Sequence, residues 1–473
     1  MSRHNADRLS LVVPNFGCAG KNSGPASRSR GRQGDRVGNG GSVEPEADLP
    51  VNAVAPPVLT PASGRGAWLL RWRAGERKTF YLCALVLGSS AFVLLIYMQT
   101  IWAEFIGQIP GQPPPFGDFF ALWSYAKIAS AQPAAALYDF AGLHASQVAL
   151  GMVPSAYNPF PYPPTFILYL WPLSLLPYEA AYLVWMLATL ALFVWAVVAT
   201  CSRLPLCVLG VIVAPAGIAT IASGQSGFLA AALITAGVRL GGSRPLLAGL
   251  LIGLLSYKPQ LGLLVPIAFV AAGFWTALGV ACTTALALAL VATLAFGWAV
   301  WPAWISMLSV YAGMFDRETV GLKFMPTVMA NLRKAGVTLP VAKGVQAVVA
   351  LAVAILVWRC FRRHPGRLAT AALLVGTFLA TPHAFVYDLP MVTAALALFI
   401  AARTDAGSTL RLEEVLILIL AFLFPVFMLK SGVNLPVSTV PLVLFFGLIL
   451  WREKNPRRPH PAAQQLGAEG PAR

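Results

Sequence analysis

Acidic side chains are rare in the long apolar part of this chain, and one of them could act as a base. The acidic residues between Thr79 and Trp358 are Glu104, Asp118, Asp139, Glu179, Asp316 and Glu318. Asp118 ends a stretch rich in proline and glycine, GQIPGQPPPFGD, and precedes an apolar segment. It is either a helix N-cap, worth about 1 kcal/mol, or a general base that removes a proton from a reacting hydroxyl. Its position alone favours neither interpretation.

Lys258 is the most informative cation of the sequence. It lies between the apolar runs Leu251 to Leu255 and Leu261 to Val265. An unpaired lysine in hydrocarbon costs several kcal/mol, and Pro259 beside it removes a backbone N–H and bends the helix. The lysine therefore either extends to a membrane interface or supplies the positive charge that binds a phosphate.

Three further polar groups interrupt apolar segments. Tyr157 and Tyr162 belong to YNPFPYPPT, which could be only a proline-rich helix start, and Gln225 belongs to GQSG. His383 and Asp388 belong to TPHAFVYD, which is either a packed end of a span or part of the same polar pocket. Because an imidazole titrates near neutral pH, His383 could orient a substrate hydroxyl or support a proton transfer.

Membrane-spanning helices are the elements that must position these residues. The 473-residue chain is 58% hydrophobic and 11% charged, whereas soluble domains average roughly 45–50% and 25%. A water-soluble enzyme is therefore excluded. From Lys78 to Trp451 the apolar residues form runs of roughly 15–25, the length that crosses about 30 Å of hydrocarbon. The sequence predicts an all-α polytopic membrane protein with roughly 11–13 transmembrane helices, at least one of them bent or re-entrant.

The predicted spans cover approximately residues 79–102, 163–176, 178–200, 205–222, 227–240, 245–273, 276–300, 343–358, 368–386, 389–402, 412–429 and 436–451. Residues 104–160 and 301–342 form two outer loops. The first carries an amphipathic pattern from Asp118 to Leu150, interrupted by Pro133, which predicts two short interfacial helices along the membrane surface.

Both ends of the chain are basic, and the formal net charge is +16. Residues 1–66 are rich in Gly, Ser, Pro and Arg and predict a disordered tail. Residues 67–78, AWLLRWRAGERK, predict a basic interfacial helix. Residues 403–451 add C-terminal transmembrane helices, and 452–473 form a basic tail. The positive-inside rule puts both termini in the cytoplasm. Nucleic acid is a weaker explanation of the charge, because the cationic runs border spans.

The motifs, in this order, resemble glycosyltransferase family 87, whose members are GT-C-type integral membrane transferases. The matching motifs are GDFFALWSYA with Asp118, ALYD with Tyr138, YPPT at 162–165, PLSLLP at 172–177, GQSG at 224–227, RPLLAGLLIGLLSYKPQ at 244–260 and TPHAFVYD at 381–388. The likeness covers about residues 79–402, which therefore form the expected GT-C-like catalytic module.

The resemblance implies that a hexosyl group, mannosyl in the best-studied members, moves from a polyprenyl-phosphate sugar donor to a glycan or glycolipid acceptor. The outer-loop aspartate, Asp118, would be the catalytic base of an inverting transfer at the outer face, in a bacterial inner (plasma) membrane. Lys258, helped by Arg317 or Lys323 of the second loop, would stabilise the donor phosphate. The residues assigned to substrate binding are Tyr138, Tyr162, Gln225, His383 and Asp388.

No cofactor is expected, because the sugar is already activated as a phosphodiester and a lysine can balance one phosphate charge. The six cysteines form no CxxC pair and have no histidine at metal-ligand spacing, so no metal site is predicted. The main alternative is a transporter or flippase of lipid-linked saccharides, which would also have broken helices and an intramembrane lysine. A purely structural scaffold explains neither the buried lysine nor the outer aspartate.

Overall fold

The computed structural model describes residues 86–93, 95, 118–152, 154, 156, 158–199, 210–317, 321–405, 410–429 and 436–455. Within these ranges the chain is helical and contains no strand. The chain divides into two units, and the unit Asn15–Ala74 lies outside the described residues. The predicted tail 1–66, the basic helix 67–78, most of the first span and nearly all of the C-terminal tail also lie outside them.

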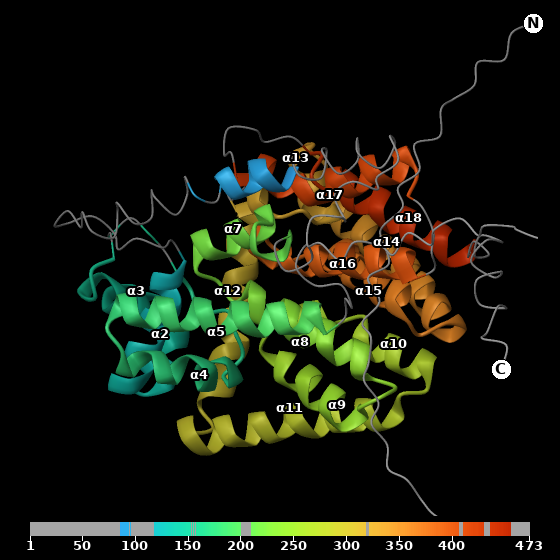
Figure 1. Cartoon of the computed structure of the whole chain (residues 1–473). Helices are drawn as coiled ribbons and strands as arrows, with labels where there is room; N and C mark the ends of the chain where they lie inside the picture. The colour runs from blue at the N-terminus through green and yellow to red at the C-terminus, as the bar shows by residue number, and fades with distance from the viewer. Residues whose placement is uncertain are drawn as a thin grey trace, which may run out of the picture. The chain divides into compact units, whose positions relative to one another are not determined.

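The α-helices, shown in Figure 1, are α2 (Phe119–Ala131), α3 (Phe140–Ala149), α4 (Thr165–Leu170), α5 (Tyr178–Val198), α7 (Pro215–Ser223), α8 (Gly227–Leu240), α9 (Pro245–Leu254), α10 (Val265–Ala272), α11 (Trp275–Phe296), α12 (Val300–Arg317), α13 (Val328–Lys334), α14 (Leu339–Arg363), α15 (Arg367–Ala380), α16 (Pro390–Asp405), α17 (Leu412–Leu429) and α18 (Val440–Lys454). The 3-10 helices are η2 (Ala134–Tyr138), η3 (Trp171–Leu175), η4 (Leu255–Tyr257), η5 (Pro259–Gly262), η6 (Gly321–Phe324) and η7 (Val386–Asp388).

The prediction of an all-α, multi-pass membrane protein is confirmed. Within the described residues, four segments are long and apolar enough to cross a membrane, namely Tyr178–Val198, Trp275–Phe296, Leu339–Arg363 and Val386–Arg403. Shorter apolar helices accompany them. Each span predicted from residue 163 onwards overlaps one or more α-helices of the described residues. The number of 11–13 spans stays a prediction.

The span predicted at 245–273 is broken at the expected proline. Helix α9 ends at Leu254, the two 3-10 turns η4 and η5 follow, and α10 begins at Val265. Pro259 starts η5, and Lys258 between the two turns has φ −128° and ψ 66°, outside the helical region. Because proline offers no N–H and collides with the preceding turn, the helix cannot continue here. The lysine therefore projects from a non-helical residue within an apolar segment.

The first outer loop contains the two predicted helices, α2 and α3, with Pro133 between them. Nine of the 13 residues of α2 are buried, and this helix packs against α4, η3 and α5. Asp118 stands immediately before its first residue. Burial of α2 therefore fixes the position of the predicted base.

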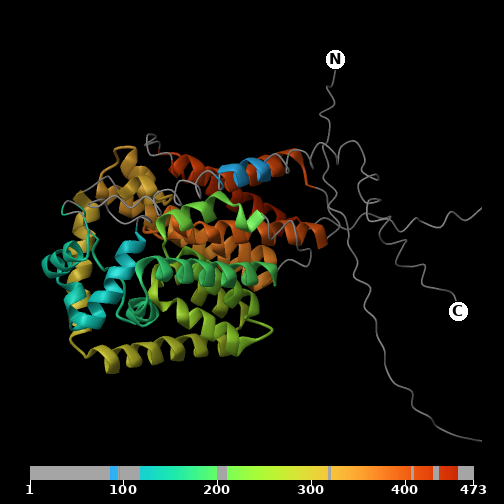
Figure 2. The same cartoon turned by 60° about the vertical axis from the view of Figure 1, so that its left-hand side comes forward.

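The second outer loop, expected at 301–342, is largely helical. Helix α12 follows α11 and rises from its end towards α13 (Figure 1 and Figure 2), and it packs against η2, which lies between α2 and α3 in the chain. Val300 and Met307 of α12 are buried, and Trp304 donates a hydrogen bond to the Pro161 carbonyl at 3.1 Å. Spacings of three and four residues put Val300, Trp304, Met307 and Tyr311 on one face of a helix. This face holds α12 against the protein.

A buried glutamine fixes the C-terminal end of α15. The Gln346 side chain accepts a hydrogen bond from the Met329 amide at 2.9 Å, and it donates to the carbonyls of Leu379 and Ala380 at 2.8 and 3.0 Å. The Thr327 hydroxyl also donates to the Pro382 carbonyl at 3.0 Å. These bonds position the segment that leads to Asp388.

Basic residues of the C-terminal helices lie at the ends of these helices that are far from Asp388. Arg452 of α18 pairs with Glu414 of α17, and both side chains are buried. Arg363 at the end of α14 lies 3.5 Å from Glu453. Helix α15 begins at Arg367, so these basic groups and Asp388 lie at opposite ends of the α15–α16 hairpin.

Candidate functional site

Asp118 occupies the N-cap position of α2, yet its carboxylate makes no capping hydrogen bond. Instead, Oδ2 accepts a hydrogen bond from Nε2 of Gln225 at 3.2 Å. The interpretation as a helix cap is therefore wrong. Burial raises the pKa of Asp118 above its usual value of 3.8, while the Gln225 hydrogen bond and the charge of Lys258 act in the opposite direction. Asp118 and Lys258 thus lie within one electrostatic cluster.

Lys258 is buried and paired. Its ammonium lies 2.7 Å from Oδ1 of Asp388, and each side chain is only 3% exposed. The ammonium also lies 5.0 Å from the centre of the Tyr387 ring, and the second Asp388 oxygen accepts a hydrogen bond from the Phe385 amide at 3.1 Å. Extension of the lysine to a membrane interface is therefore wrong. Its charge is balanced by a carboxylate of the protein.

The turn between α7 and α8 packs between the segment that carries Asp118 and the segment that carries Asp388. Gly224 has φ +66°, and a Cβ there would lie 2.3 Å from the Cβ of Phe119, the neighbour of Asp118. A Cβ at Gly227 would lie 1.7 Å from the carbonyl oxygen of Tyr387, the neighbour of Asp388. Residues 224–227 therefore fit between the two acidic segments only because glycine has no side chain.

The two tyrosines predicted for the site, Tyr162 and Tyr138, form a chain of hydrogen bonds that ends at Gln225. The Tyr162 hydroxyl donates to Oε1 of Gln225 at 3.3 Å. The Tyr138 hydroxyl in turn donates to the carbonyl of Tyr162 at 3.0 Å. Tyr138 therefore fixes the Tyr162 backbone.

Tyr311 of α12 is a member of the cluster that the sequence analysis missed. Burial raises the pKa of its phenol above the ordinary value, and the negative charges of Asp118 and Asp388 raise it further. Both carboxylates therefore act on the same phenol, which is half-buried. The signal that could have found it is the apolar and aromatic stripe that ends with Trp304, Met307 and Tyr311.

Lys323, Arg317 and His383 are the remaining predicted site residues. The Lys323 ammonium lies 4.8 Å from the centre of the Phe324 ring. Arg317 is the last residue of α12, and its side chain lies outside the described residues. The backbone of His383 exchanges hydrogen bonds with the Thr381 hydroxyl at 3.3 Å. Their roles stay predictions.

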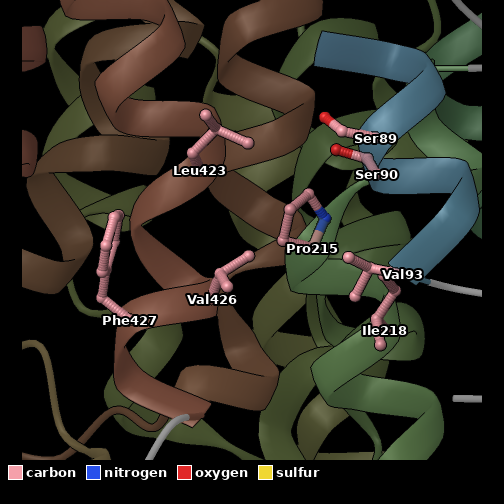
Figure 3. A pocket seen from close by; sticks show the side chains of 8 residues that line it. All are labelled: Ser89, Ser90, Val93, Pro215, Ile218, Leu423, Val426 and Phe427. Carbon is pink, nitrogen blue, oxygen red and sulfur yellow. The ribbon is translucent and has the colours of Figure 1, made fainter. Parts of the chain in front are cut away.

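A cavity of about 180 Å³ lies elsewhere, between residues 86–93, α7 and α17. Figure 3 shows its lining, in which two serine hydroxyls accompany apolar side chains. None of the predicted site residues lines it. Within the described part of the chain, no group of three or more His, Cys, Asp or Glu side chains is arranged to hold a metal.

The family model described as Glycosyltransferase family 87 matches residues 160–382. The matched region contains Tyr162, Gln225 and Lys258, while Asp118 precedes it and Asp388 follows it. Among curated proteins and solved structures, none matches the chain.

Proposed function

This chain belongs to glycosyltransferase family 87, and from that premise we propose which reaction the membrane glycosyltransferase performs. It transfers a hexosyl group from a polyprenyl-phosphate sugar to a hydroxyl of a glycan or glycolipid, and mannose is the proposed sugar. Asp118 is the general base. The observation that supports this most is that the 224–227 turn contacts both acidic segments: Gln225 donates a hydrogen bond to Asp118, and Gly227 packs on Tyr387, the neighbour of the Asp388 that pairs with Lys258.

The proposed step is a single displacement. The acceptor oxygen attacks the anomeric carbon, and the bond from that carbon to the phosphate oxygen breaks with its electron pair leaving on the polyprenyl phosphate. Asp118 takes the acceptor proton. Because attack and departure occur on opposite faces, the anomeric configuration inverts. No cofactor takes part, since the phosphodiester is already the activated form of the sugar.

Lys258 stabilises the leaving phosphate in this proposal. An ammonium has three N–H donors, and the bond to Asp388 uses one of them. Because Asp388 already balances the charge of Lys258, the donor phosphate needs a further positive charge. Arg317 and Lys323 of the second outer loop are the proposed sources of that charge. Tyr162 and His383 remain the proposed contacts to substrate hydroxyls.

The site is proposed to open at the outer face of a bacterial plasma membrane, with both termini in the cytoplasm. Support comes from the α15–α16 hairpin, in which Arg367 and Arg403 lie at the end opposite Asp388. Since basic residues favour the cytoplasmic side, the end that carries Asp388 is the outer one. There a polyprenyl chain can stay in lipid while its head group meets a polar acceptor.

The test is to incubate the purified protein with labelled polyprenyl-phosphate mannose and candidate acceptors. We expect labelled acceptor and free polyprenyl phosphate in equal amounts, and other polyprenyl-phosphate sugars identify the donor. Asp118→Asn should lower turnover by about 10²–10⁴-fold, the usual contribution of a general base, with donor binding retained. Asp139→Asn is the matched control, because Asp139 is an exposed carboxylate of the same loop. Retained turnover in Asp118→Asn removes the base assignment. Movement of the intact sugar lipid across vesicles without its cleavage indicates a flippase.

A further inference from the structure

The side-chain amide of Gln225 is engaged by the protein at both ends. Nε2 donates to Oδ2 of Asp118 at 3.2 Å, and Oε1 accepts from the Tyr162 hydroxyl at 3.3 Å. The side chain is buried, with 6% of the residue exposed. An amide with both groups engaged is poorly suited to the substrate contact that its motif suggested.

The chemistry of the partners fixes which end of the amide faces which residue. An ionised carboxylate only accepts hydrogen bonds, so it requires the NH₂ group. The Tyr162 hydroxyl can then donate to the amide oxygen. The chain of bonds therefore has one direction, from Tyr162 through Gln225 to Asp118, when Asp118 is ionised.

The backbone on both sides of this chain is held tightly. The turn that carries Gln225 is confined by Phe119 at Gly224 and by the Tyr387 carbonyl at Gly227. Tyr162 is held by the Tyr138 hydrogen bond at 3.0 Å. The amide is therefore presented to Asp118 from a rigid support.

We propose that Gln225 is a positioning residue, which holds Oδ2 of Asp118 and leaves Oδ1 to take the proton of the acceptor. This inference rests on the proposed function, because it needs Asp118 to be the base. Gln225 acts through Asp118 and touches neither donor nor acceptor. Tyr162 contributes to catalysis through the orientation of the amide, in addition to any contact of its own with substrate.

The first test replaces Gln225 by leucine, which has a similar size and no amide. Misplacement of a reacting group by about 1 Å can cost about 10²-fold, so Gln225→Leu should lower kcat about 10- to 100-fold. The KM values for donor and acceptor should stay close to wild type. Since the Gln225 hydrogen bond lowers the pKa of Asp118, the acid limb of the rate profile should also move to higher pH. Gln225→Glu should move it in the same direction, because a second carboxylate beside Asp118 disfavours ionisation.

The second test is a double-mutant cycle with Tyr162→Phe, which removes only the hydroxyl. If the Tyr162 hydroxyl acts through the Gln225 amide, Tyr162→Phe should lower kcat in the wild-type background but not in the Gln225→Leu background. Thr283→Val, a substitution at an exposed position of α11, is the control that shows how much activity is lost on purification in detergent alone. Thermal denaturation of each variant separates loss of fold from loss of rate.

The outcomes distinguish this inference from the proposed function. Unchanged kcat and an unmoved acid limb in Gln225→Leu overturn the positioning role, and so does a rise of KM with kcat preserved. If Gln225→Leu gives one of these two results and Asp118→Asn is inactive, Asp118 is still supported as the base. If Asp118→Asn is fully active, the proposed base fails and the positioning role fails with it. Should Gln225→Leu not fold, Gln225→Asn, which keeps the amide but is shorter by one methylene, decides the question: kcat should fall with KM preserved, and an unchanged kcat overturns the positioning role.

Discussion

The ammonium of Lys258 and the carboxylate of Asp388 lie 2.7 Å apart, although 130 residues separate them along the chain. Both side chains are almost fully withdrawn from solvent. Removal of one member of a buried ion pair leaves an uncompensated charge, which typically costs about 3–5 kcal/mol. This pair is therefore both a structural bond between distant segments and the charge centre beside the proposed base.

Lys258→Met and Asp388→Leu should each destabilise the protein strongly, because each leaves one buried charge unpaired. The double variant Lys258→Met/Asp388→Leu should recover much of the stability, since it removes both charges, but it should not recover transfer. Thermal denaturation in detergent and the turnover assay measure the two effects separately. If Lys258→Met binds polyprenyl phosphate as tightly as wild type, the phosphate role of the lysine is wrong.

The rate of transfer should fall at acid pH as Asp118 becomes protonated. Burial raises the pKa of this carboxyl above its usual value of 3.8, so the acid limb of kcat/KM should lie above that pH. The same shift affects stability, because the folded state binds more protons than the unfolded state between the two pKa values. In that range Asp118 makes stability decrease as pH rises. Asp118→Asn should abolish this slope, and an acid limb below the ordinary value would contradict the burial of the carboxyl.

Gly227→Ala should impair both folding and turnover, since the added Cβ would lie 1.7 Å from the Tyr387 carbonyl oxygen. A backbone atom cannot rotate away, so the turn and the segment with Asp388 must separate. Gly279→Ala is the matched control, because it is a helical glycine of α11 with no atom within 4 Å of the new Cβ. That substitution should be neutral or should stabilise by up to about 1 kcal/mol. Wild-type activity in Gly227→Ala would show that the two segments are not in contact.

Stability should rise with pH above neutrality because of Lys334. Burial lowers the pKa of this lysine from 10.5 to about 8. Between these values the unfolded chain binds more protons than the folded one, so the free energy of unfolding increases with pH. Below pH 8 both states are protonated and the lysine contributes no slope. Lys334→Gln should remove the increase between pH 8 and 10.5, as followed by denaturation at several pH values, and an unchanged slope would exclude this lysine as its cause.

The spans and the break at Pro259 could be predicted because they depend on local properties. The length of an apolar run and the missing proline N–H act within one segment. Helix α12 was missed because it lies in a region that is neither apolar enough for a span nor marked by turn residues. Its face of Val300, Trp304, Met307 and Tyr311 is a helical pattern, but the partners of that face, which include η2 and the Pro161 carbonyl, come from distant parts of the chain.

The site was predicted in part, since the motifs indicated which residues matter but not how they pair. Lys258 required a partner on physical grounds, yet nothing local identifies Asp388 as that partner. Gln225 was assigned to substrate, whereas its contacts are with Tyr162 and Asp118. Pairings of this kind arise from tertiary packing, which the order of motifs does not encode.

The sequence separation of the ion pair also bears on how the protein is made. At about 5–20 residues per second, the ribosome delivers Asp388 roughly 6–26 s after Lys258. During that interval the lysine lacks the carboxylate that pairs with it in the folded protein, and a lysine at the centre of a span costs about 2.5–3.5 kcal/mol in insertion experiments. The broken segment from α9 to α10 should therefore insert less stably until Asp388 is made, and nascent chains that stop before Asp388 should be targets of membrane quality control.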